Sequence, residues 1–310
     1  MVHRRRRRGG LRKIQGVPLD RALALEGGGP EFATTLSREW EIWGPNGGYL
    51  AALALRAAGL CAEVGRPASF YCHFLRSPEF APVELQVTVP RRGRRSESLS
   101  VAMTQEGRPV LQALVRTAAE APGYEHQELR PPQVPPAGEL RNVEELLPPE
   151  QRPPFSFWEN IERRPCDWDG PHRGRGDEPA DEPHAEEPHA DDESPADTRR
   201  AVTREWTRFR PTAAFSDPFL DAARSLILLD TYGWPAAYRR YRDRSMVAPN
   251  LDTAAWFHRF SPDSEWLLID HACPVGHAGL LGVGGRVWDA EGRLLATGGG
   301  QLCCLPAPAG

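Results

Sequence analysis

The residues that first suggest chemistry are two glycines placed directly before an expected helix, in the stretch WGPNGGYLAALALRAA at 43–58. The first four amides of a helix have no partner within it and lie at the positive end of its dipole. Because Gly47 and Gly48 carry no side chain, a substrate oxygen could approach these amides closely, next to Asn46. Such a site suits the oxyanion that forms when a carbonyl carbon is attacked. The same three residues also fit an ordinary turn and helix cap, so both interpretations stay open.

The helix that follows these glycines is expected over 47–63. It is apolar on nearly every side, so a sheet must enclose it. A second helix is expected over 217–230, where Asp217 followed by Pro218 is a favourable N-cap and first position. Each helix is followed by alternating strand patterns, so the two halves of the chain have the same order of elements.

Short matches support this internal repeat. FLR at 74–76 and FHR at 257–259 end alternating runs, and EGR at 106–108 and 291–293 marks a hairpin turn, at offsets of 183 and 185 residues. A long helix enclosed by a curved antiparallel sheet is the hotdog arrangement. Two copies in one chain predict an α+β double hotdog whose sheets join edge to edge and cover each other's edge strands. Two unrelated α+β domains are the alternative.

Composition divides the chain further. Residues 171–198 hold ten acidic residues and two arginines, and 121–200 are rich in proline. We therefore expect an N-terminal hotdog at 20–120, a Pro-rich and acidic linker at 121–200 that is disordered over 171–198, and a C-terminal hotdog at 201–310. Residues 1–19 are expected to be a disordered basic leader without the apolar segment of a secretory signal.

The charge and the cysteine content of the chain indicate which binding partners and which cellular compartment to expect. The net charge is −4 and the body of the chain is close to neutral, which argues against a nucleic-acid partner. No run of eighteen apolar residues exists, so no membrane span is expected. Six cysteines without CxxC spacing are typical of reduced thiols in a cytoplasmic protein. Assembly into a homo-oligomer is left open.

The chain resembles the acyl-CoA thioesterase II (TesB-like) family of hotdog proteins. The resemblance rests on WGPNGGYLAALALRAA at the first helix, FLR at 74–76, NLDTAAWFHR at 250–259, EWLL at 265–268 and VWDAEGRLLATGGGQL at 287–302. It covers most of both halves and none of the linker. It implies a cofactor-free and metal-free enzyme whose substrate is an acyl-CoA, hydrolysed to a carboxylic acid and coenzyme A.

The resemblance also implies a site in which an Asp, a Thr or Ser, and a Gln hold the attacking water. The matching positions are Asp252 as general base and Gln301 as the residue that positions water, while Gly47 or Gly48 would lend amides to the oxyanion. The hydroxyl is expected after EWLL, where IDHACPVGHAG has no Ser or Thr, and Thr253 should point to the opposite strand face from Asp252. The alternative is therefore a catalytically degenerate acyl-thioester-binding hotdog protein.

Other groups were weighed as site residues. Asp230 ends the second expected helix and would be the next candidate base, although an ordinary pairing with an arginine is also compatible. His271 and Cys273 could replace the missing hydroxyl, but structural roles suit them better. Asp270, His271, Cys273 and His277 do not converge easily on a metal. A dehydratase on the same fold would want a histidine before the first helix, where none occurs.

Overall fold

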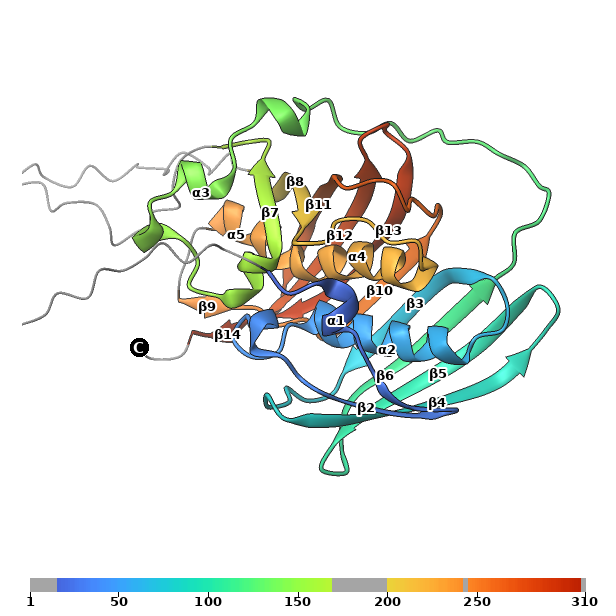
Figure 1. The fold of residues 1–310 in the computed structure, drawn as a ribbon. Helices are drawn as coiled ribbons and strands as arrows, with labels where there is room; N and C mark the ends of the chain where they lie inside the picture. Colours follow the sequence, from blue (N-terminus) through green and yellow to red (C-terminus); the bar gives the residue numbers. More distant parts are fainter. Residues whose placement is uncertain (1–15, 169–199, 242–244, 308–310) are drawn as a thin grey trace, which may run out of the picture.

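The computed structural model of this chain describes residues 16–168, 200–241 and 245–307 (Figure 1). Most of the expected basic leader and all of the expected disordered segment at 171–198 lie outside the described residues. Within them, no helix is long and apolar enough to cross a membrane.

Two long helices lie side by side at the centre of the molecule (Figure 1). Helix α2 (Gly47–Cys61) is buried on nearly every side, as its composition predicts, and it begins where the Asn46 side chain accepts a hydrogen bond from the N–H of Tyr49. Helix α4 (Pro218–Thr231) begins at Asp217, whose carboxylate caps the N–H groups of Phe219 and Leu220. Both expected helices are therefore present within one or two residues of their predicted ends.

A twelve-stranded antiparallel sheet wraps around these helices, in the order β1-β2-β4-β5-β6-β3-β10-β13-β12-β11-β8-β7. Alternating burial along its strands, as in β4, puts one face on the helices and the other outward. The N-terminal half supplies β1 (Glu26–Gly28), β2 (Glu31–Thr35), β3 (Arg66–Phe74), β4 (Pro82–Arg92), β5 (Ser96–Gln105) and β6 (Arg108–Ala118). The C-terminal half supplies β7 (Ile161–Pro165), β8 (Val202–Phe209), β10 (Asp252–Phe257), β11 (Leu267–His277), β12 (Leu280–Asp289) and β13 (Leu294–Cys303).

The two halves meet where β3 pairs antiparallel with β10, with Thr253 opposite Cys72. Neither strand is left as an open edge, because β3 also pairs with β6 and β10 with β13. The strand order on one side of this seam mirrors the order on the other. The predicted double hotdog with sheets joined edge to edge is confirmed.

The expected linker contains structure of its own. Its described part holds four short helices and β7, which extends the sheet beside β8. The Trp206 side chain donates a 2.9 Å hydrogen bond to the carbonyl of Pro135, and Ala137 packs with Trp206, Leu268 and Trp288 on the outer face. The remaining elements are α1 (Leu19–Ala22), η1 (Arg38–Trp40), η2 (Ala137–Glu139), α3 (Val143–Leu146), η3 (Pro149–Gln151), η4 (Ser156–Asn160), α5 (Gly233–Tyr241), β9 (Met246–Val247) and β14 (Leu305–Pro306).

Candidate active site

A buried carboxylate lies where the two halves meet. Asp230 is in the last turn of α4 and only 4% of it is exposed to solvent. Its Oδ1 atom accepts a 2.6 Å hydrogen bond from the Asn250 side-chain amide and a 2.8 Å bond from the Thr253 hydroxyl. Its partners are thus an amide and a hydroxyl, and the arginine pairing considered for this residue is not the arrangement found. These two bonds fix the plane of the carboxylate.

Asn250 and Thr253 are held in place by their own elements. The Asn250 amide also donates a 2.8 Å hydrogen bond to the carbonyl of Asp230. One side chain is thus hydrogen-bonded to both the backbone and the carboxylate of Asp230. Thr253 is the first inward-facing residue of β10 and is 1% exposed. Strand alternation therefore turns its hydroxyl toward α4.

The carboxylate has an unusual affinity for protons. Burial raises the pKa of Asp230 from 3.8 to about 6, against the opposing effect of hydrogen bonds from Asn250, Thr253 and the Gly48 amide. A carboxylate whose pKa lies near the working pH is suited to act as a general base. The neighbouring thiol of Cys72 has its pKa raised well above the usual value by burial and by the negative charge of Asp230, so it is a neutral thiol and a poor nucleophile.

The glycine pair singled out in the sequence lies against this carboxylate. A Cβ atom on Gly47 would come within 2.9 Å of Asp230 Oδ2 and 3.1 Å of the Phe74 ring. A Cβ atom on Gly48 would come within 2.9 Å of the Ile227 Cα atom, so this glycine allows α2 and α4 to approach closely. The structure therefore brings Gly47 and Gly48 together with Asp230, from opposite halves of the chain.

The amides of the first turn of α2 are partly occupied. The Gly48 N–H bonds to Asp230, and the Asn46 side chain accepts from the Tyr49 N–H at 2.9 Å. Asn46 also donates a 3.2 Å hydrogen bond to the Thr231 hydroxyl, and it is buried. Asn46 thus makes the contacts of a helix cap. Among the described residues, the amide of Gly47 has no hydrogen-bond acceptor.

Asp252 and Gln301 lie together, but on the other face of the sheet. The Gln301 N–H donates a 3.1 Å hydrogen bond to Asp252 Oδ1. Because Thr253 faces the helices, its neighbour Asp252 faces outward, and the exposed Gln301 lies beside it. The structure therefore separates these two expected residues from the glycine pair by the thickness of the sheet.

The structure also shows where the other candidate site residues, which belong to β11, are located. Burial lowers the pKa of His271 to about 4, and its Nε2 lies 3.0 Å from the carbonyl of Leu229, beneath α4. Cys273 packs with Ala237 and Leu302 in a separate apolar cluster. The Asp270 carboxylate pairs with Arg204 and Arg286. Within the described ranges, no three His, Cys, Asp or Glu side chains are placed to hold a metal ion.

Comparison with protein families agrees with this layout of two halves. The profile of the acyl-CoA thioesterase N-terminal domain matches residues 36–118, and that of the acyl-CoA thioesterase C-terminal domain matches residues 144–299. The second match alone spans half of the chain. The chain belongs to the acyl-CoA thioesterase family. No curated protein sequence matches it.

Solved structures share the fold of this thioesterase family member. A conserved hot dog protein of unknown function from Alicyclobacillus acidocaldarius has a TM-score of 0.73 at 24% identity, over 94% of this chain and 98% of that one. Acyl-CoA thioesterase II TesB2 from Mycobacterium marinum has a TM-score of 0.70 at 20% identity, over 94% and 99% of the two chains. The tesB protein of Mycobacterium avium subs paratuberculosis has a TM-score of 0.69 at 19% identity, over 93% and 98%. At these identities the likeness shows the double hotdog fold.

The internal repeat of this chain creates a second, unequal junction between α2 and α4 at the other end of the two helices. There α4 begins beside the end of α2, but a Cβ on Gly59 would lie within 2.5 Å of the Phe219 ring. In this second junction the ring of Phe219 fills the space that the Asp230 side chain occupies in the first junction. This junction carries no carboxylate base in the equivalent place.

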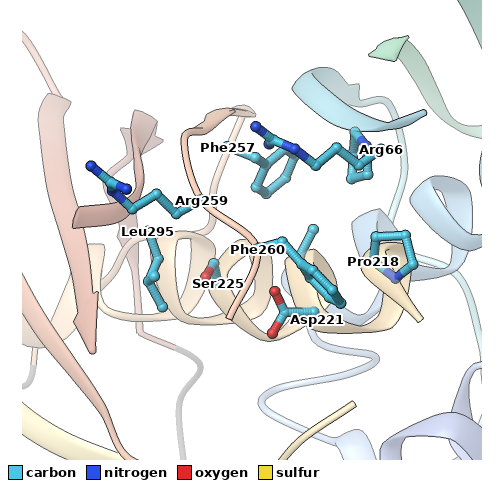
Figure 2. Close-up of a pocket in the computed structure, with 10 residues that line it drawn as sticks. Arg66, Pro218, Asp221, Ser225, Phe257, Arg259, Phe260 and Leu295 are labelled. Atoms are coloured by element: carbon cyan, nitrogen blue, oxygen red, sulfur yellow. The ribbon is translucent and has the colours of Figure 1, made fainter. Parts of the chain in front are cut away.

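A small, shallow pocket that opens to solvent lies beside this second junction (Figure 2). Asp221 and Ser225 of α4 point toward it, and Arg66 and Arg259 flank its mouth (Figure 2). The Asp221 carboxylate is already bonded to Arg224 and accepts a 3.0 Å hydrogen bond from the N–H of Ser261. This carboxylate is therefore engaged in structure and is not free to act as a base.

Two residues of the Asp230 cluster were missed from the sequence as site residues. Asn250 and Thr253 both stand in the quoted stretch NLDTAAWFHR, on either side of Asp252. The signal was the strand alternation, which turns Thr253 to the face opposite Asp252. Combined with a helix that must pack on that inner face, it points to a pairing of Thr253 with a residue of the second helix.

Proposed function

We propose that this member of the acyl-CoA thioesterase family hydrolyses acyl-CoA thioesters, with Asp230 as the general base that activates water. The observation that carries the proposal is the buried carboxylate with a pKa of about 6, oriented by Asn250 and Thr253 at the glycine-rich start of α2. An Asp, a hydroxyl residue and an amide residue are the three kinds of side chain that the family resemblance implied. Asp230, Thr253 and Asn250 supply them in one cluster.

The proposed reaction uses the two carboxylate oxygens differently. Oδ1 is held by Asn250 and Thr253, whereas Oδ2 faces Gly47. A water beside Oδ2 would transfer a proton to the carboxylate while the oxygen of that water attacks the thioester carbon. The tetrahedral intermediate then collapses, the carbon–sulfur bond breaks, and coenzyme A leaves as a thiolate that takes up a proton. The other product is the free carboxylic acid.

Helix α2 supplies the electrostatic part of the mechanism. Its N-terminus carries partial positive charge, and the amide of Gly47 points outward from the first turn. We assign this amide to the negative oxygen that forms on the attacked carbonyl. The Gly48 amide has a different role, because it helps to hold the Asp230 carboxylate.

Asp252 and Gln301 remain the competing assignment for the base and the water-positioning residue. Their 3.1 Å contact on the outward face supports a local pairing. Asp230 is the better candidate because it is buried, its pKa is raised, and it lies against the glycines of α2. The two assignments place the chemistry on opposite faces of one sheet, so single substitutions separate them.

The test is coenzyme A release from short, medium and long acyl-CoAs, followed with a thiol-reactive dye. Asp230→Asn is expected to lower kcat/KM by ~10²-fold or more, whereas Asp252→Asn and Gln301→Ala change it by less than ~3-fold. A large loss in Asp252→Asn with an active Asp230→Asn would move the base to the outward face. Folded wild-type protein that binds acyl-CoA without turnover would instead identify a degenerate thioester-binding protein.

A further inference from the structure

The pocket beside the second junction is lined by residues from both halves of the chain (Figure 2). Arg66 begins β3 of the N-terminal half, and Arg259 follows β10 of the C-terminal half. Ser225 projects into the pocket from the middle of α4. Because the pocket opens to solvent, a small ligand could reach the contact between the two halves here.

Ser225 supplies a buried hydroxyl that has no partner. Only 4% of this residue is exposed to solvent, and its side chain points toward the pocket (Figure 2). A serine within a helix usually faces solvent or bonds to the carbonyl four residues earlier. Within the part of the chain that the structure describes, the Ser225 hydroxyl makes no hydrogen bond. A polar group that enters the pocket would therefore find this hydroxyl free to pair, as buried polar groups normally do.

Two arginines give the mouth of the pocket a positive charge. Arg66 Nε lies 4.0 Å from Glu120 Oε1, which is a loose contact with a side chain that is 87% exposed. Arg259 has no carboxylate partner among the described residues. Burial lowers the pKa of His258, and the positive charges of Arg66 and Arg259 lower it further. The two charges thus act on the same region of the surface, where they would attract an anion.

The acidic residue of the pocket, Asp221, does not cancel these two charges. Its carboxylate is bonded to the buried Arg224 and accepts a 3.0 Å hydrogen bond from the N–H of Ser261. The pair of Asp221 and Arg224 is neutral as a unit. The charges of the two arginines at the mouth therefore remain available to a ligand.

The other lining residues are apolar and indicate which kind of anion fits. A phosphate carries up to two charges and would lose hydration against such walls. A carboxylate carries one charge, pairs well with arginine, and can bring a hydrocarbon chain to the walls. Because the pocket is small and shallow, this chain must be short. The apolar residues are Pro67, Pro218, Ala222, Phe257, Phe260 and Leu295.

We propose that this pocket is a binding site for a short-chain aliphatic carboxylate. The carboxylate group lies between Arg66 and Arg259, and one of its oxygens accepts a hydrogen bond from Ser225. The hydrocarbon packs on Phe257 and Leu295. The bound acid then links the two halves at the end of α4 opposite to the candidate active site. This site is independent of the proposed function, because its binding is measured without turnover.

The test is titration of the full-length protein with butyrate, followed by saturation-transfer NMR on the signals of the acid. Wild type is expected to bind butyrate with a Kd between about 0.1 and 10 mM. Two probes separate the parts of the ligand, since 1-butanol lacks the charge and inorganic phosphate lacks the hydrocarbon. Each should bind at least ~10-fold more weakly than butyrate.

Substitutions place the ligand in this pocket. Arg66→Gln and Arg259→Gln should each weaken butyrate binding by ~10-fold, and Ser225→Ala by ~3-fold or more. Arg108→Gln is the matched control, because Arg108 is an exposed arginine at the start of β6 and should not matter. Circular dichroism checks that each variant is folded.

Three results would overturn the proposal. The first is wild-type protein that binds no butyrate at about 50 mM. The second is binding that Arg259→Gln and Ser225→Ala leave unchanged, which would place the acid elsewhere on the protein. The third is phosphate that binds more tightly than butyrate, which would identify a phosphate site. Coenzyme A release from acyl-CoA decides the proposed function separately from all three.

Discussion

The Thr253 hydroxyl donates a 2.8 Å hydrogen bond to Oδ1 of Asp230, which joins the first inward residue of β10 to the last turn of α4. The same Thr253 is paired with Cys72 across the seam between the two halves. The carboxylate is therefore oriented by the strand that holds the double hotdog together. Its Oδ2 atom, in contrast, is turned toward Gly47 of the N-terminal half. The site is formed by both halves and neither half could form it alone.

Replacing Thr253 with Val should change how activity depends on pH. The Thr253 hydrogen bond favours the charged form of Asp230 and so lowers its pKa, which burial has raised to about 6. In wild type, kcat/KM should rise with pH through about 6 and then level off, since the base must be deprotonated. In Thr253→Val this rise should move up by about one pH unit, with ~5-fold less activity at pH 6 and less than ~3-fold less at pH 9.

The matched control for this pH profile is Thr253→Ser, which keeps the hydroxyl and should keep the wild-type midpoint. A profile of Thr253→Val that is lowered equally at every pH would show that Thr253 acts only on packing. It would also remove the support that this bond gives to Asp230 as the titrating base.

Asp230→Asn should alter the pH dependence of stability as well as activity. The pKa of Asp230 is raised in the folded protein to about 6, above the 3.8 of an unperturbed carboxyl. The folded state therefore binds a proton more tightly, and the charged carboxylate destabilises it increasingly as pH rises from 3.8 through 6. Asn carries no such charge, so the unfolding free energy of Asp230→Asn relative to wild type should rise by about 1–2 kcal/mol between pH 5 and 7.5.

Urea denaturation of both proteins at several pH values measures this difference. Asp252→Asn is the matched control, since it makes the same chemical change on the outward face of the sheet. A difference between Asp230→Asn and wild type that is constant over this pH range would mean that Asp230 is not held with a raised pKa.

The fold was predictable because its signals are local and repeated. A helix apolar on every side, such as α2, requires a sheet around it, and the EGR turns at 106–108 and 291–293 mark hairpins in both halves. The structure within the linker was harder to predict. Its strand β7 has only five residues, and the linker packs on Trp206 and Leu268, which are far along the chain. A short strand at the edge of a sheet has little periodicity of its own.

The candidate site was only partly predictable. Gly47 and Gly48 were singled out because glycine before a helix is a local signal. The choice between Asp230 and Asp252 depends on which face of β10 lies under α4, and on burial that raises one pKa. Neither is a property of a short stretch of sequence. Both follow from long-range packing, in which Asn250, Thr253 and the start of α2 meet one carboxylate.

Replacing each glycine of the pair with Ala should give two different results. In Gly47→Ala the new methyl group would lie within 2.9 Å of Asp230 Oδ2 and 3.1 Å of Phe74, packed against the carboxylate oxygen assigned to the attacking water. We expect kcat to fall by ~10²-fold while stability changes by less than about 1 kcal/mol, because the contacts that must give way are side-chain ends.

In Gly48→Ala the methyl group would instead meet the Ile227 backbone, 2.9 Å from its Cα and 3.0 Å from its carbonyl oxygen. The helices α2 and α4 must then move apart, which should cost about 1–3 kcal/mol of stability. Coenzyme A release together with thermal unfolding separates the two effects. If Gly47→Ala retained wild-type kcat, the carboxylate oxygen next to Gly47 would not be the one that activates water, because the methyl group packs directly against that oxygen.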